Sequence, residues 1–270
     1  MKRLLVLSFL ILLPTSVLAQ ALYDDEPQEE TFMFSVGGFY SNNYDSKIRI
    51  DSTQLGVGTI INLEDNLGLD KSVGVVKVDG FYRFSPKYRM EFSYISTNRK
   101  GYAEINEDLQ IGDQVYAAGN RLTSQFRSNI LKVDWAYSFI NVKKYEAKIG
   151  LGLNIRQALI DVDGVVAETN KSVSVSEYLP LPTFNVGFRY NFTNNLALHY
   201  RSKIFAVNYG DYKGRIKDTT FALEHNTFSH IGFGLGINAF SSNFEAEGNN
   251  FRGEIETSYM GLLLYMKGYY

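Results

Sequence analysis

Histidine is the side chain that most often transfers protons in catalysis, and this sequence has three: His199, His225 and His230. A hydrolase would pair a histidine with a serine or an aspartate, but the chain has no Gly-x-Ser-x-Gly turn and no His-x-x-x-His pair. Each histidine lies close to a predicted short turn, at residues 193–195 or 226–229. We therefore predict no catalytic residue, no metal and no cofactor. A site built from carboxylates alone stays open, and a lipid- or peptide-hydrolysing enzyme is kept as an alternative.

Acidic residues also gather in one polar segment, residues 62–70, which contains Glu64, Asp65 and Asp70. Carboxylates in such a segment could bind a divalent cation or the cation-bridged phosphates of a lipopolysaccharide. Their spacing differs from that of the twelve-residue calcium loop, whose ligands stand at alternate positions. The segment is therefore interpreted as an acidic turn.

A larger set of charged residues occupies alternate positions in segments rich in aromatic residues. Successive side chains of a β-strand point to opposite faces, so alternation places the charges on one face and the apolar residues on the other. If the charged face is an interior, it carries a basic excess. The interior candidates are Lys77, Asp79, Arg83, Arg89, Glu91, Lys132, Asp134, Glu146, Lys148, Arg156, Arg189, His199, Arg201 and Lys203.

The alternating segments form four predicted hairpins, with short turns at residues 85–87, 141–144, 193–195 and 226–229. The pattern Tyr-x-Phe recurs just before three of the turns. It occurs as Tyr82 with Phe84, Tyr137 with Phe139, and Tyr190 with Phe192. A hairpin repeat with aromatic residues at one level is typical of strands that meet a membrane interface. The first and last strands add two to the eight of the hairpins, so the pattern predicts ten strands, with eight or twelve as alternatives.

The N-terminus has the features of a secretory signal. Lys2 and Arg3 precede an apolar run, and a small-residue cleavage site follows after Ala19 or Ala21. We predict a signal peptide over residues 1–19, an acidic periplasmic tail over residues 20–30, and one β-domain over residues 31–270. Beyond the signal, no segment has the roughly 20 apolar residues of a spanning helix. A membrane-spanning chain of this kind must therefore be a closed barrel, since only a helix or a closed sheet satisfies its backbone hydrogen bonds in hydrocarbon.

Composition agrees with this architecture. Aromatic residues make up 14% of the chain, with 19 Tyr and 19 Phe, and cysteine is absent. The formal net charge is −2, and five acidic residues stand in the short tail (Asp24, Asp25, Glu26, Glu29 and Glu30). Without the signal and the tail the charges nearly balance, which argues against a nucleic-acid partner.

The last segment, residues 258–270, alternates to the final residue and ends on an aromatic side chain. Its apolar face carries Leu262, Leu264, Met266 and Tyr270. This tail resembles the closing strand of a Gram-negative outer-membrane β-barrel, by which the barrel assembly machinery recognises its substrates. The signal, the strands, the Tyr-x-Phe turns and this terminus together resemble the small outer-membrane barrel proteins, the OmpW-like and related families. The resemblance implies an all-β antiparallel barrel in the outer membrane, with outer-membrane lipid, lipopolysaccharide and the assembly machinery as partners. The predicted extra hairpin departs from the eight-stranded members.

The long connections would then face the cell exterior. They cover residues 41–71, 97–127, 157–182, 206–216 and 241–253, and the second carries strand-like alternation that predicts a hairpin extending above the membrane. Interior charges can pair across a narrow lumen and plug it, or line a pore that prefers anions. The plug is favoured because ten strands enclose little more space than eight, whose lumen side chains fill. We predict a barrel that acts through its surface loops or a plugged or narrow lumen, with a narrow channel for small solutes as the alternative.

Overall fold

The computed structural model describes residues 30–52, 58–111, 113–166, 169–210, 212–247 and 252–270. The predicted signal peptide, and the acidic tail up to residue 29, lie outside the described residues. The described chain is built from β-strands. No helix long and apolar enough to cross a membrane is found in it.

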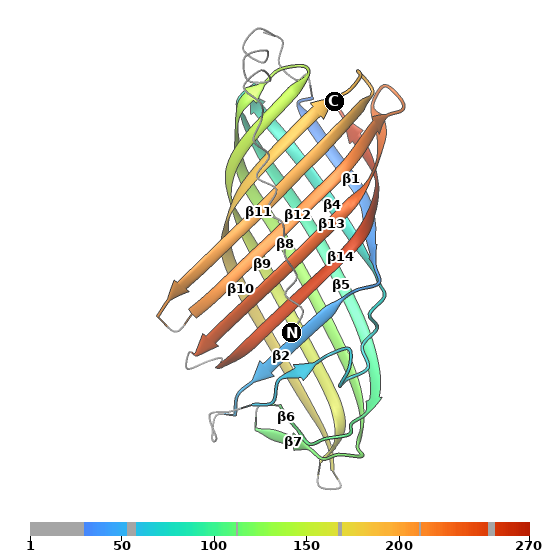
Figure 1. Ribbon diagram of the computed structural model, residues 1–270, viewed down its shortest axis with the longest axis vertical. Helices are drawn as coiled ribbons and strands as arrows, with labels where there is room; N and C mark the ends of the chain where they lie inside the picture. The colour runs from blue at the N-terminus through green and yellow to red at the C-terminus, as the bar shows by residue number, and fades with distance from the viewer. Residues whose placement is uncertain (1–29, 53–57, 112, 167–168, 211, 248–251) are drawn as a thin grey trace, which may run out of the picture.

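Within the described residues, long antiparallel strands follow one another around a closed ten-stranded barrel (Figure 1). The last strand pairs with the first, with Met33 opposite Tyr269, and this pairing closes the sheet. The prediction of a ten-stranded antiparallel barrel is confirmed. In chain order the barrel strands are β1 (Phe32–Ser41), β4 (Val73–Ser85), β5 (Tyr88–Glu104), β8 (Arg121–Asn141), β9 (Tyr145–Val166), β10 (Thr169–Asn191), β11 (Leu196–Tyr209), β12 (Tyr212–Asn226), β13 (Ile231–Glu247) and β14 (Arg252–Tyr269).

The two ends of the barrel differ. One end carries the short turns between β4 and β5, β8 and β9, β10 and β11, and β12 and β13, and here the backbone N–H of Thr31 donates to Tyr270 O at 2.7 Å. The other end carries the long hairpins and four further strands, at the bottom of Figure 1. These are β2 (Asp45–Ile50), β3 (Ile61–Asn62), β6 (Leu109–Ile111) and β7 (Gln114–Tyr116). Strand β2 continues the line of β1 along β14, with Ser258 opposite Asp45.

A belt of apolar side chains surrounds the barrel near the short-turn end. On β8, for example, Leu131, Val133 and Trp135 point outward and are 42%, 39% and 48% exposed. The belt ends at a common level on three neighbouring strands, where Lys217, Ser241 and Ser258 lie opposite one another. An outward apolar band of this kind is the surface that a transmembrane barrel presents to lipid.

The aromatic residues before the turns form the edge of the belt next to the short-turn end. Tyr82 contacts Phe84 edge-on with ring centroids 5.0 Å apart, and Phe84 stacks on Trp135 at 5.5 Å. Tyr190 and Phe192 form a similar edge contact at 4.8 Å. Aromatic rings of this kind suit the interface between hydrocarbon and water, because one part of the ring is apolar and another is polar.

The strands extend much further from the membrane than the sequence analysis predicts. Residues 157–182 were expected to form a loop, but β9 continues to Val166 and β10 begins at Thr169, so that prediction is wrong. The reason is a change of polarity along β9. Up to Arg156 the inward residues are charged, polar or glycine, whereas beyond it Ala158, Ile160 and Val162 turn apolar side chains inward. Because the pattern of a lipid-facing strand ends there, the sequence predicts that the strand ends near Arg156. The extended hairpin predicted for the second long connection is present as the outer parts of β5 and β8.

Candidate functional site: the lumen and its outer cap

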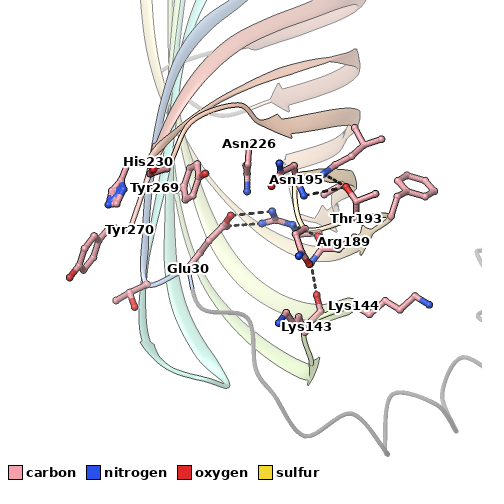
Figure 2. Close-up of a pocket in the computed structure, with 17 residues that line it drawn as sticks. Glu30, Lys143, Lys144, Arg189, Thr193, Asn195, Asn226, His230, Tyr269 and Tyr270 are labelled. Atoms are coloured by element: carbon pink, nitrogen blue, oxygen red, sulfur yellow. Dashed lines mark hydrogen bonds and ion pairs between the residues drawn. The ribbon is translucent and has the colours of Figure 1, made fainter.

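The lumen at the short-turn end is closed by an ionic cluster around Glu30. The guanidinium of Arg189 on β10 donates to both carboxylate oxygens of Glu30, at 2.6 and 3.1 Å (Figure 2). Lys267 on β14 donates to Glu224 on β12 at 2.8 Å, and the hydroxyl of Tyr265 donates to the same carboxylate at 2.6 Å. A mouth cavity of about 830 Å³, lined in part by Arg189 and Glu30, opens beside this cluster. Glu30, two residues before β1, is therefore bound inside the barrel mouth.

The charge state of Glu30 follows from these contacts. Burial on its own would raise the pKa of the Glu30 carboxyl, but Arg189 and Lys267 outweigh burial and hold that pKa below its usual value of 4.5. Glu30 is therefore ionised throughout the neutral range. Its carboxylate links the segment before β1 to the lumen side chains of β10 and β14.

A second ionic cluster lies deeper, on the wall formed by β4, β5, β8 and β9. Glu146 accepts from Arg83 at 2.9 Å and from Arg89 at 3.0 and 3.1 Å. Arg89 also donates to Glu91 at 2.7 Å, and Lys148 forms an ion pair with Glu91. All five side chains are buried, so each charge has its partner within the protein instead of in water. Breaking such a pair leaves a buried charge without compensation.

A third cluster spans the lumen between strands that are far apart in the sequence. Asp134 on β8 forms an ion pair with Lys203 on β11 and accepts from the Asn185 side chain at 3.1 Å. Lys132 forms an ion pair with Asp218 on β12. Gly152 is needed here, because a Cβ at this position would come within 2.0 Å of an Asp134 carboxylate oxygen.

Lys77 and Arg201 complete this level by sharing Asp79, at 2.8 and 3.5 Å. A small cavity of about 30 Å³ lies beside Asp79, Arg89 and Arg201. That volume holds about one water molecule. The charged side chains therefore fill this part of the lumen.

An aromatic layer lies between the ionic clusters and the long hairpins. Tyr259 on β14 is at its centre and stacks with Phe39, Tyr44 and Phe240 at centroid distances of 4.8, 5.1 and 5.0 Å. The guanidinium of Arg156 is also buried, and its nitrogens donate to hydroxyls of Thr257 and Ser242 at 3.0 and 3.4 Å. Among the described residues Arg156 has no carboxylate partner.

A hydrophobic cap closes the outer end. It combines the segment between β2 and β4, the β6–β7 hairpin and the inward faces of the outer strands. Its buried members are Ile48, Ile61, Leu63, Leu67, Leu69, Ile105, Leu109, Ile111, Tyr116, Leu122, Phe126, Ala158, Ile160, Val162 and Ile255. Gly68 has φ +67 and lies against the backbone of Tyr102, where a Cβ would come within 2.4 Å of the Tyr102 carbonyl oxygen. A glycine is therefore required where the segment crosses β5.

One buried ion pair fixes the cap to the barrel. Arg99 on β5 forms an ion pair with Glu64 and donates to Ser46 Oγ at 2.8 Å. Its guanidinium lies 4.1 Å from the ring centroid of Tyr44 and 5.1 Å from that of Phe126. The Glu64 carboxylate also accepts from the Ser46 backbone N–H at 2.8 Å. The acidic turn proposed for this segment thus directs Glu64 inward, and no group of side chains able to hold a metal ion is found among the described residues.

The structure places every interior candidate from the sequence on the inner face of the sheet. Most are buried, and Asp79, Arg189, His199 and Arg201 are half-buried. His199 lies 3.8 Å from Glu224, whereas His225 and His230 are exposed at the turn β12–β13. The four terminal-strand residues Leu262, Leu264, Met266 and Tyr270 point outward and are 63%, 63%, 52% and 80% exposed.

Three features of the site were missed by the sequence analysis. These are the position of Glu30 in the mouth, the Arg99–Glu64 pair and the aromatic layer around Tyr259. Arg99 and Tyr259 do occupy inward alternate positions on β5 and β14, so their inward orientation could have been predicted from the alternation. Glu30 and Glu64 lie outside any alternating segment, and nothing in the sequence indicates which charge they meet.

Comparison with known proteins adds the wider context. No family model and no curated protein matches the chain. Among solved structures, the outer membrane protease OmpT of Escherichia coli is 8% identical with a TM-score of 0.52, over 88% of this chain and 97% of that one. The chain therefore has the fold of Gram-negative outer-membrane β-barrel proteins. At this low sequence identity, the structural similarity shows that the two proteins share a fold, and it gives no information about activity.

Two further structures are similar at lower scores. Ail, the attachment invasion locus protein of Yersinia pestis, is 12% identical with a TM-score of 0.38, over 88% of this chain and 99% of that one. OprG of Pseudomonas aeruginosa is also 12% identical, with a TM-score of 0.40 over 90% of this chain and 99% of that one.

Proposed function

We propose that this outer-membrane barrel does not conduct solutes and acts through its outer surface. The filling of the lumen is the observation that carries the proposal. Charged side chains pair across the inner half, the Tyr259 stack occupies the middle, and the cap fills the outer end. A pore that conducts ions needs a water-filled path whose binding sites hold the ions weakly, whereas these charged side chains are paired with one another.

The outer extension provides the surface for such a role. Several of its outward side chains are polar and form hydrogen bonds across neighbouring strands. Gln125 donates to Asn98 at 2.9 Å, and Arg127 donates to Asp161 at 2.9 Å. Because the inward side chains below them pack in the cap, the polar surface stands on a solid core. A rigid, ordered surface loses little entropy when a partner binds, and this suits recognition of an extracellular molecule.

Single-channel recording of the refolded barrel tests the proposal, with retained heat-modifiable migration as the proof of folding. We expect no discrete conductance steps from the wild-type protein or from Arg201→Ala, because the neighbouring pairs still fill the lumen. Arg127→Ala, on the outer face, is the matched control. Steps whose ion preference changes in Arg201→Ala but not in Arg127→Ala would make the lumen the conducting path and contradict the proposal.

A non-catalytic role is part of the same proposal. His199 is half-buried in the lumen beside Glu224, away from the outer surface where an extracellular substrate would arrive. His225 lies at a short turn, where its Nδ1 is 3.1 Å from Thr227 Oγ1. Turnover of phospholipid or peptide by the folded protein, abolished in His199→Ala, would overturn this part.

A further inference from the structure

The barrel wall has an incomplete seam between β10 and β11. Their pairing runs from Asn191 opposite Ala197 to Phe184 opposite Ile204, and no pairing between the two strands is described beyond that point. Further out, β10 pairs with β9 as far as Thr169, and β11 pairs with β12. The two strands therefore part at the level of Phe184 and Ile204.

The sequence of β10 fits a strand that has lost one neighbour. Pro180 and Pro182 lie just beyond the last paired position, and neither has a backbone N–H to donate. Proline within a sheet is confined to edges and irregular positions for this reason. The two prolines thus reduce the number of donors left unpaired at the seam, where unsatisfied donors in a membrane are costly.

An apolar groove lies on the seam. It has a volume of about 610 Å³ and is lined mainly by Leu151, Phe184, Ile204, Ala206 and Pro182. Leu151 and Ile204 are 70% and 50% exposed, on the face of the barrel that points to lipid. The groove is therefore open from the membrane side.

The inner wall of the groove is closed. Thr183 and Ile216 also line it, and both are buried on the lumen side. Ile216 belongs to the core cluster around Tyr259, and Phe205, a further lining residue, packs against that cluster. The groove is a blind recess in the wall instead of an entry to a channel.

Basic side chains stand at the outer end of the groove. Arg215 and Lys217 line it and point outward from β12, next to Lys213, which forms an ion pair with Glu245 at 3.4 Å. Lys217 lies opposite Ser241, at the edge of the apolar belt, where lipid head groups begin. Among the described residues, Arg215 and Lys217 form no ion pair. Two cations with no carboxylate partner in the described part of the chain thus stand beside an apolar recess.

We propose that this groove binds one phosphorylated, acylated lipid of the outer leaflet, the lipid A part of lipopolysaccharide. An acyl chain lies in the recess against Leu151, Phe184 and Ile204. A phosphate on the head group is bound by Arg215 and Lys217, since guanidinium and ammonium groups form strong charge-assisted hydrogen bonds with phosphate. The inference does not depend on whether the lumen conducts.

Other occupants match the groove less well. A neutral hydrocarbon would fill the recess but leaves Arg215 and Lys217 unexplained. A second copy of the chain, packed about a two-fold axis through the groove, would bring Arg215 and Lys217 against their own equivalents. An acylated phosphate satisfies the apolar and the basic parts together.

The experiment measures binding of purified lipid A to the refolded barrel in nanodiscs of uncharged phospholipid. The test variants are Arg215→Gln/Lys217→Gln, which removes the phosphate partners, and Ala206→Phe, which fills the recess. Lys100→Gln/Arg121→Gln is the matched control, because it also removes two outward charges from the barrel, on β5 and β8. We expect each test variant to bind lipid A about tenfold more weakly than wild type, and the control to stay within about twofold.

Further measurements distinguish binding of the whole lipid from binding of phosphate alone. Lipid A without its phosphates should bind wild type as weakly as intact lipid A binds the charge variant, and excess inorganic phosphate should not displace bound lipid A. Loss of binding in the charge variant with full binding by Ala206→Phe would overturn the recess as the acyl site. Equal losses in the charge variant and in the Lys100/Arg121 control would show general attraction to a basic surface and overturn the site. Heat-modifiable migration verifies that each variant is folded.

Discussion

The inner and outer halves of this barrel use the same strands with opposite polarity. On β9, Ile149, Leu151 and Leu153 face lipid while Lys148 and Arg156 face the lumen. Beyond Arg156, Ala158, Ile160 and Val162 turn apolar side chains inward, while the outward positions include the polar residues Gln157, Asp161 and Asp163. The solvent around each half decides the pattern, because hydrocarbon surrounds one half and water the other. The inner half is thus held by buried ion pairs, and the outer half by a hydrophobic core like that of a water-soluble protein.

The largest expected effect comes from breaking a buried pair in the inner half. Asp134→Ala leaves Lys203 buried without its carboxylate partner, and we expect the free energy of unfolding to fall by about 3–5 kcal/mol. Asp161→Ala is the matched change in the outer half, where the pair with Arg127 is solvent-exposed. Its loss should cost at most about 1 kcal/mol. Urea unfolding in lipid vesicles measures both values, and equal losses would refute the contrast between the halves.

Introducing an arginine on the outer face of the barrel is a second test of the difference between the two halves. Val133→Arg and Thr123→Arg lie on the same face of β8, the first within the apolar belt and the second beyond it. A charge on the lipid face should destabilise the barrel by about 2–4 kcal/mol if it lies near the middle of the membrane, and by close to zero at the interface. We therefore expect a clear loss for Val133→Arg and nearly unchanged unfolding for Thr123→Arg. If both variants unfolded at the wild-type urea concentration, the belt would not mark the hydrocarbon region.

Much of this architecture was predictable, because alternation is a local property. Strand parity placed Lys132 and Asp134 inward and Trp135 outward, and the four short turns together with parity gave the strand number. The outer extension was harder. Leu159 interrupts the alternation there, and the outward positions include Gln157, Asp161 and Asp163, so this stretch resembles a polar surface loop when a lipid-facing strand is sought.

Partners across the lumen could not be predicted. Lys132 pairs with Asp218, and Lys203 with Asp134, over separations of 86 and 69 residues. Such pairs depend on the register of every intervening strand, and a one-residue slip in any strand reverses its faces. The seam between β10 and β11 has the same origin, since only the pairing pattern shows where two strands part. Pro180 and Pro182 were its one local sign.

The smallest expected effect concerns the link between Glu30 and the lumen. Its pKa is held below 4.5, so the Glu30 contacts stabilise the folded barrel fully above the usual carboxyl range. That stabilisation falls as the pH drops through the lowered pKa, because the folded carboxyl then takes up a proton. We expect Glu30→Gln to lower the free energy of unfolding by about 1.5–3 kcal/mol at neutral pH, the range for a hydrogen bond to a charged group. The difference from wild type should shrink as the pH falls well below 4.5. Glu30 and a glutamine differ in their contact with Arg189 only while the Glu30 carboxylate is ionised. A difference in the free energy of unfolding that stays constant with pH would therefore assign the effect to lost packing.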